Sequence, residues 1–363
     1  MKTFLKLCAC LLAAAVLLSL AGCAKDPVAF SYNGTDISTN MYRYWLSSYK
    51  GTFMYAYTDM SDTDAFWDSV LFGDVTAEEY LNGAVIDNVK RNLVCLSLFE
   101  QYGLSLSDSA VAAIDDYIEE LTEEYADGSR QKFNQTLAGY GVNLNMLREI
   151  YIMEEKISLL FEYLYADGGP FALTEETLDA YYRENYVRVR HIYVNDAYAY
   201  ETNDAGYYTY DSAGNAVIRD LTEEELAEKT EKIEAIDKAL AEGTDFQTVY
   251  ETYSEDLYYA NGYYLTRETD FISEVVDAAF SLGIGETVRV KSDYGTHYLM
   301  RLELDPFAYN DTASNADFFN GFTDKVKNDD LLRRLNELLP EVTVVEEEVK
   351  KYSIRDAAVN YSI

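Results

Sequence analysis

The hydrophobic pattern of this chain changes its period near residue 186, and this change constrains the fold more than any other feature. Between Ile37 and Tyr165 apolar residues recur every three to four positions, which predicts successive α-helices. The segment from Val187 to Val194 is rich in β-branched residues and indicates a strand. Strands and helices then follow one another as far as Leu302. A chain that is helical first and mixed afterwards is predicted to be α+β.

Composition limits the classes of partner. The 363 residues include 29 Lys and Arg against 64 Asp and Glu, a formal net charge of −35. Such an acidic surface repels phosphate groups, so we expect no nucleic acid as a partner. The length predicts two or three domains, and 48% hydrophobic residues are enough for packed cores.

Local signals divide the chain further. Thr76 and Glu79 form a capping box at the start of one helix, which Gly103 ends. The Tyr-rich stretch from about 198 to 218 predicts a protruding hairpin. Further helices are expected from Thr222 to Ala241, around 246–253, from Ile272 to Leu282 and from Ala316 to Leu339, with a hairpin formed by 288–290 and 297–302 and a last strand at 342–345.

The N-terminus has the layout of an export signal. Lys2 and Lys6 precede the largely apolar run 11–20, which is too short to span a membrane. The run ends in Leu-Ala-Gly-Cys at 20–23, which resembles the lipobox of bacterial lipoproteins. We therefore expect a signal peptide at 1–22, lipidation of Cys23 and a tether at 23–30. The alternative is an ordinary secretory signal cut near Ala21 or Ala24, with Cys23 left as a free thiol.

Most catalytic motifs are missing from the sequence. It contains no Gly-rich phosphate loop, no His-Glu-x-x-His, no Cys-x-x-Cys and no Gly-x-Ser-x-Gly. With only two histidines we expect neither a metal site nor a cofactor. His191 and His297 both fall on predicted strands, where a buried histidine is usually a hydrogen-bonded core residue.

The sequence around these histidines favours a function. Five short motifs, in order, resemble the parvulin family of peptidyl-prolyl isomerases: 189–194 (VRHIYV), 253–256 (YSED), 276–282 (VDAAFSL), 285–286 (GE) and 294–297 (YGTH). The resemblance covers residues 186 to 304, and the flanking helices and lipobox resemble those of PrsA-type and SurA-type extracytoplasmic foldases. It implies a helical chaperone domain at 31–172, an inserted parvulin-like domain at 173–306 with a small sheet surrounded by helices, and a C-terminal helix and tail at 307–363 that pack on the chaperone domain.

The same resemblance implies the site. His191 and His297 face each other across the sheet and, with Asp256, form the catalytic set, and Ser292 supplies a hydroxyl beside the second histidine. Substrate contacts fall on Ser292 and on three apolar positions: Phe271, Val275 and Phe280. Two of these depart from the family, because a Met and a Phe usually stand at 271 and 275, and the glycine-rich loop is shortened at 261–264.

Three functions follow as hypotheses. The first is a membrane-anchored foldase on the outer face of a bacterial membrane that isomerises prolyl bonds in unfolded exported proteins. There the Asp256 carboxylate would destabilise the planar amide of the substrate. The second is a holdase chaperone whose parvulin-like domain has a structural or peptide-binding role and does not catalyse isomerisation. The third is a solute-binding lipoprotein, which requires two lobes of repeated βαβ units that the helical N-terminal half does not provide.

Overall fold

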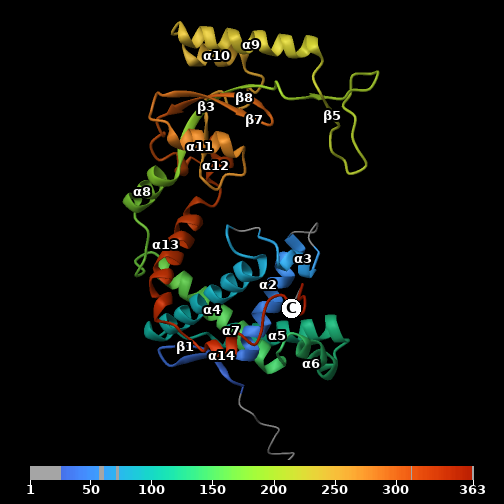
Figure 1. The fold of residues 1–363 in the computed structure, drawn as a ribbon. Helices are drawn as coiled ribbons and strands as arrows, with labels where there is room; N and C mark the ends of the chain where they lie inside the picture. Colours follow the sequence, from blue (N-terminus) through green and yellow to red (C-terminus); the bar gives the residue numbers. More distant parts are fainter. Residues whose placement is uncertain (1–25, 57–60, 71–72, 312, 362–363) are drawn as a thin grey trace, which may run out of the picture. The chain divides into compact units, whose positions relative to one another are not determined.

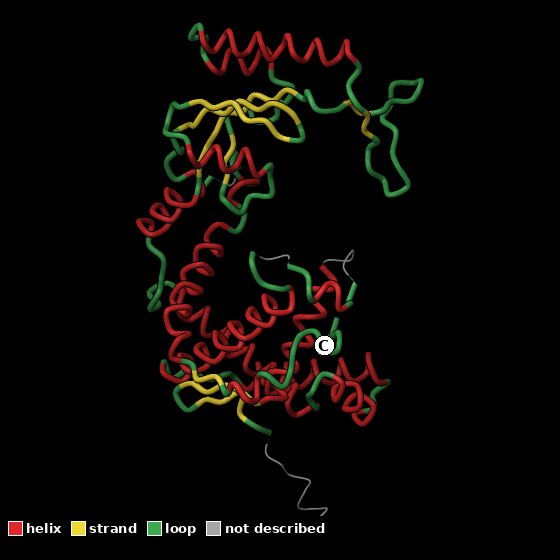
Figure 2. Tube along the Cα trace, in the orientation of Figure 1, coloured by secondary structure: helices red, strands yellow, loops and turns green. Residues whose placement is uncertain are grey.

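The computed structural model describes residues 26–56, 61–70, 73–311 and 313–361. The predicted signal peptide and Cys23 lie outside these residues. The chain divides into two compact units, unit 1 up to Ala172 and from Asn328 on, and unit 2 from Leu173 to Lys327. Helices alternate with small antiparallel sheets, which confirms the α+β class (Figures 1 and 2). Among the described helices none is both long and apolar enough to cross a membrane.

Unit 1 is mainly helical. Its helices are α2 (Thr39–Ala56), α3 (Asp64–Trp67), α4 (Ala77–Gln101), α5 (Asp108–Ala126), α6 (Arg130–Gly139) and α7 (Leu144–Tyr165). The predicted capping box is present, because the Thr76 hydroxyl accepts from the Glu79 N–H and the Glu79 carboxylate accepts from the Thr76 N–H. Gly103 ends α4 at φ 67°, a backbone angle that favours glycine.

The C-terminal segment completes unit 1. Strands β1 (Val28–Tyr32) and β2 (Thr35–Ser38) form a hairpin, and β9 (Thr343–Val344) pairs antiparallel with β1. The short helix α14 (Glu346–Val349) packs against β1 and α2. The two ends of the sequence therefore share one small sheet.

Unit 2 is built on a four-stranded antiparallel sheet of order β6-β3-β8-β7. The elements of this unit are α8 (Glu175–Asn185), β3 (Val187–Val194), β4 (Ala199–Tyr200), β5 (Ile218–Arg219), α9 (Glu223–Ala241), α10 (Phe246–Tyr253), β6 (Tyr263–Leu265), α11 (Ser273–Ser281), β7 (Thr287–Ser292) and β8 (Gly295–Leu302). Figure 1 shows α9 and α10 on one face of the sheet and α11 on the other.

The two faces follow from strand alternation, since successive side chains point to opposite sides. Ile192 and Val194 of β3 join the apolar cluster under α9 and α10. Val187 and Val189 join the cluster under α11. His191, which follows Val189 by two positions, therefore also lies on the α11 face.

The structure corrects one predicted helix and one boundary. The single helix expected from Ala316 to Leu339 is divided into α12 (Ala316–Phe319) and α13 (Phe322–Leu338). Gly321, at φ 71°, makes the break. Residues 307–327 were expected to pack on the N-terminal helices, but they belong to unit 2. The reason is an aromatic cluster that gathers residues from both ends of the unit: Tyr182, Tyr186, Tyr264, Tyr309, Phe319 and Phe322.

The Tyr-rich segment forms a small insert between β3 and α9. Three backbone hydrogen bonds join the segments around Glu201, Thr209 and Val217 in a ring. The Thr209 N–H donates to the Glu201 carbonyl, the Glu201 N–H to the Val217 carbonyl, and the Val217 N–H to the Thr209 carbonyl, at 2.8–2.9 Å. Two isolated bridges, Thr202 with Tyr208 and Tyr210 with Ala216, extend the pairing. Figure 2 shows that most of this insert is loop.

Candidate functional site

Antiparallel pairing of β3 with β8 brings the two histidines together. Tyr193 lies opposite His297 and His191 opposite Leu299, so the histidines occupy diagonal positions on one face. The His191 Nε2 lies 2.8 Å from the His297 Nδ1, and the rings stack with centroids 5.1 Å apart. Both side chains are buried. Each ring is therefore fixed by the other.

Ser292 extends this pair toward the surface. Its Oγ lies 2.7 Å from the His297 Nε2 and accepts a hydrogen bond from the Tyr294 N–H at 3.1 Å. Ser292 stands at the end of β7, where the turn into β8 leads directly to the second histidine. The result is a chain of three side chains that ends on a backbone amide.

The histidines are held neutral. Burial lowers the pKa of His191, and the neighbouring His297 lowers it further. Burial also lowers the pKa of His297, with a smaller contribution in the same direction from Lys291. One proton on each imidazole is enough for both hydrogen bonds in the chain. The floor of the site is thus polar but uncharged at neutral pH.

An open pocket lies beside this chain. It is lined by two segments, 270–274 before and within α11 and 292–294 at the β7–β8 turn. Phe271 is 42% exposed and meets the His191 ring edge-on at 6.3 Å between centroids. Tyr294 is 52% exposed. The lining also includes the acidic residues Asp270, Glu274 and Asp293, and the buried histidine pair lies behind Ser292 and Phe271.

Two further aromatic residues enclose the histidines, and sequence reasoning missed both of them. Tyr193 stacks on His297 at 5.1 Å, and its hydroxyl donates to the Tyr294 carbonyl at 2.7 Å. Tyr263 lies 6.0 Å from His191, and its buried hydroxyl has no hydrogen-bond partner among the described residues. Strand alternation was a usable signal for Tyr193, which follows His191 by two positions.

The structure separates the remaining predicted residues from the pocket. Val275 was expected to contact substrate, but it is fully buried in the cluster under α11, because a valine is too short to reach the surface from this position. Phe280 packs on the edge of the same cluster, with Arg267 4.4 Å above its ring. Val275 therefore supports the pocket from beneath, and Phe280 is not among the pocket-lining residues.

Asp256 lies near Tyr263. Among the described residues no hydrogen bond joins its carboxylate to either histidine. Its carboxylate accepts from the Tyr258 N–H at 3.0 Å. Burial raises the pKa of Tyr263, and the Asp256 charge raises it further. The negative charge of Asp256 therefore affects the side of the site where Tyr263 lies.

No metal centre accompanies these residues. Among the described residues no group of three or more His, Cys, Asp or Glu side chains is placed to hold an ion. Both nitrogens of His297 are engaged in the hydrogen-bonded chain.

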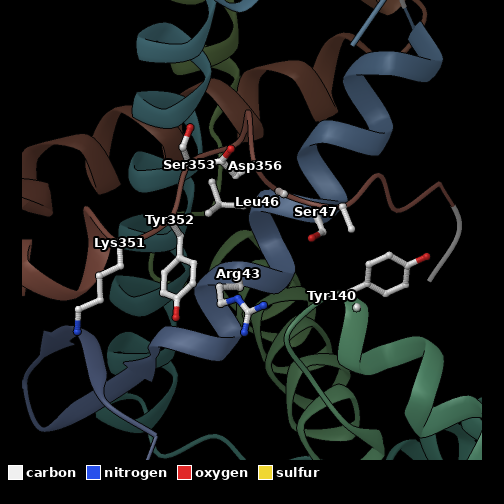
Figure 3. A pocket seen from close by; sticks show the side chains of 11 residues that line it. Arg43, Leu46, Ser47, Tyr140, Lys351, Tyr352, Ser353 and Asp356 are labelled. Atoms are coloured by element: carbon white, nitrogen blue, oxygen red, sulfur yellow. The ribbon is translucent and has the colours of Figure 1, made fainter. Parts of the chain in front are cut away.

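Unit 1 contains a separate pocket between α2, the end of α6 and the C-terminal segment (Figure 3). Arg43 and Tyr352 lie close together in it, with the guanidinium carbon 4.9 Å from the ring centroid. Its lining holds no histidine or cysteine. In this lining the Ser353 hydroxyl donates to the Glu78 carboxylate.

Comparison with known proteins gives similarity to solved structures only. No family profile and no curated protein match the chain. PrsA from Bacillus subtilis is 22% identical over 80% of this chain and 90% of its own, with a TM-score of 0.24. The peptidylprolyl isomerase PrsA from Bacillus cereus is 17% identical over 78% and 95%, with a TM-score of 0.30.

A third match comes from Campylobacter jejuni, where PEB4 and Cj1289 are described as SurA-like chaperones. It is 13% identical over 86% of this chain and 94% of its own, with a TM-score of 0.19. Superpositions at these TM-scores carry no inference about function, which has to come from the site. The chain is similar to PrsA and SurA-like structures.

Proposed function

We propose that unit 2 catalyses cis–trans isomerisation of prolyl peptide bonds in unfolded polypeptides. The observation that carries the proposal is the neutral chain of His191, His297 and Ser292 beneath an open pocket edged by Phe271 and Tyr294. Isomerisation breaks no covalent bond, so it does not require the Ser292 hydroxyl and the His297 imidazole to act as nucleophile and base.

Prolyl isomerisation requires only that such a pocket favour rotation about one amide bond. Rotation about an amide bond meets a barrier of about 20 kcal/mol because the twisted amide loses its resonance. The planar amide carries more negative charge on its oxygen than the twisted one. The buried histidine pair behind the pocket is hydrogen-bonded within itself and to Ser292, so it offers that oxygen no strong donor and favours the twisted form relative to water. Phe271 supplies an apolar edge for the proline ring.

Asp256 is proposed to act in the same direction. A carboxylate on the Tyr263 side of the site repels negative charge on the substrate carbonyl and so destabilises the planar amide. Activity that survives in Asp256→Ala would remove this residue from the mechanism.

The cellular setting is proposed from the sequence. A signal peptide at 1–22 and lipidation of Cys23 would place both units on the outer face of a bacterial membrane. There the clients are exported proteins that arrive unfolded, and the helices of unit 1 would hold them while unit 2 acts on their prolines. The strongly acidic chain favours neutral or basic client segments.

A second candidate is a holdase in which unit 2 binds peptide without turnover. The burial of Val275 favours it. Because Val275 is covered, the pocket has apolar residues on the Phe271 side only. A proline ring held on one side is restrained less, so binding survives while the barrier is lowered less.

The refolding rate of a proline-limited model protein distinguishes the two. We would measure it with catalytic amounts of residues 24–363, which retain every described residue, and with His191→Ala and Asp256→Ala. Acceleration that His191→Ala abolishes, with a melting curve that shows a folded variant, supports the isomerase. A folded wild type that suppresses aggregation but leaves the rate unchanged supports the holdase and contradicts catalysis.

A further inference from the structure

Three neighbouring tyrosines of the insert, one half-buried and two exposed, form a row that we call the tyrosine ladder: Tyr198, Tyr200 and Tyr208. The ring centroids of Tyr198 and Tyr200 are 5.4 Å apart and those of Tyr200 and Tyr208 are 5.1 Å apart. Tyr200 is 40% and Tyr208 55% exposed. The Tyr198 and Tyr200 hydroxyls lie 3.4 Å apart.

The ladder continues into the candidate active site. The pKa of Tyr198 is raised to about 12 by its hydrogen bond to Tyr200, by burial and by the nearby Tyr294 phenol. Tyr193, whose own pKa is raised by burial and then by Tyr198, donates to the Tyr294 carbonyl and stacks on His297. The strand pairing gives the same proximity, because Val194 at the end of β3 lies opposite Thr296, directly after the pocket-lining turn that contains Tyr294, so the insert leaves the sheet beside the pocket.

The backbone of the insert is held by hydrogen bonds that do not involve these rings. Its three segments are held by the ring of backbone bonds at Glu201, Thr209 and Val217. The insert contributes no residue to the apolar clusters that surround the sheet of unit 2. Large aromatic side chains left exposed on a scaffold that is held by its backbone are typical of a binding surface.

We propose that the tyrosine ladder binds the extended polypeptide arm that leaves the pocket next to the isomerised proline. This inference rests on the proposed function and names its substrate class: a long unfolded segment, as opposed to a short prolyl peptide.

Two observations select this occupant. A prolyl bond inside a protein is continuous with chain on both sides, so an occupied pocket bounded by Tyr294 must release an arm over its rim. The insert leaves β3 beside this rim, and the Tyr198 N–H is held by the Asn195 Oδ1 at 3.2 Å. The insert is acidic, with Glu201, Asp204, Asp211 and Asp220 against Arg219, which is paired with Glu225. The arm is therefore neutral or basic.

The test compares a long and a short peptide on residues 24–363. The long probe is a fluorescein-labelled peptide with one Ala-Pro bond and about twelve neutral or basic residues on each side, about 40 Å of extended chain per arm. The short probe is a labelled tetrapeptide around the same bond. Dissociation constants are measured by anisotropy, so that binding is read without turnover.

Ladder variants should weaken the long probe only. In the double variant Tyr200→Ser/Tyr208→Ser we expect the Kd of the long probe to rise about tenfold, since aromatic contacts of this kind supply a substantial part of peptide affinity. The Kd of the short probe should stay within twofold. Tyr207→Ser is the matched control, because Tyr207 is 72% exposed in the same insert but outside the ladder.

Each remaining outcome is decisive. Equal Kd values for the long probe in wild type and ladder variant overturn the inference, as does a wild type that binds no peptide, or one whose ladder binds N-acetylglucosamine oligomers instead. Ladder-dependent binding of the long probe together with absent isomerisation contradicts the proposed enzyme and leaves the ladder as a polypeptide site.

Discussion

The two faces of the sheet in unit 2 share the same strands and each carries an apolar cluster, but only one of them also carries the histidine pair. The face under α9 and α10 is apolar, with Ile192, Val194, Ile236 and Phe246 packed together. The face under α11 carries the buried histidine pair and opens to a pocket. Alternation along β3 and β8 separates the two sets by a single residue.

This difference shows how one small sheet can hold a costly polar site. Burial of two imidazoles lowers the stability of the fold unless their nitrogens form hydrogen bonds. The apolar face supplies stability without touching the pocket, so the histidine face can keep polar groups. The comparison predicts that substitutions on one face change stability and those on the other change activity.

The largest effect should come from the apolar face. Ile236→Ala on α9 removes a fully buried side chain and should lower the free energy of unfolding by about 3 kcal/mol, through lost burial and the cavity left behind. Urea unfolding measures it, with the exposed Lys238→Ala on the same helix as control. Per folded molecule, kcat/KM should stay within twofold. A larger loss of kcat/KM would show that the faces are coupled.

On the histidine face, His297→Ala should reduce activity. The substitution leaves His191 and Ser292 without their shared partner, and kcat/KM for a prolyl tetrapeptide should fall about thirtyfold, equivalent to about 2 kcal/mol. Tyr298→Phe is the control on the same strand but the opposite face, where it loses one bond to Asp237. If both variants lose activity equally, the contrast between the faces is wrong.

Acid should destabilise unit 2 through the same pair. Both histidines have a pKa below 6.5 in the folded protein, so the unfolded chain binds more protons and stability falls as pH falls below 6.5. Between pH 6.5 and 5.5 the loss should be about 1 kcal/mol per histidine. Urea unfolding at both pH values, on wild type and on His191→Asn, measures it. An unchanged slope in the variant would contradict the burial of a neutral pair.

The smallest effect should come from a helix end. The Thr222 hydroxyl accepts from the Glu225 N–H at the start of α9, and Thr222→Ala should cost about 1 kcal/mol of stability. The rate of the proposed isomerisation should not change. Thr222→Ser, which retains the hydroxyl, should restore most of the stability, and failure of this rescue would place the effect outside the cap.

Local signals in the sequence predict much of this architecture. The strand Val187–Val194 and the helix ends at Thr76 and Thr222 lie where composition and capping predict them. Local signals are enough here because β-branched runs and capping hydroxyls act within a few residues. The position of both histidines on facing strands was expected from the resemblance to parvulins.

Tertiary packing decided what the sequence did not reveal. The helical pattern of 316–339 gives no sign that Phe319 and Phe322 are drawn into the aromatic cluster around Tyr182, with Gly321 as the break between them. Nor does a sequence motif tell that Val275, within α11, is covered while Phe271, which precedes this helix, remains exposed. Burial of this kind depends on neighbours far away in the chain.

The ring of backbone bonds in the insert has an evolutionary consequence. Because Glu201, Thr209 and Val217 hold each other through main-chain atoms, their hydrogen bonds would persist with almost any side chain. Related chains can therefore exchange the surrounding tyrosines for other residues without rebuilding the fold. We expect such exchanges to change the surface that the insert presents without changing the histidine pair.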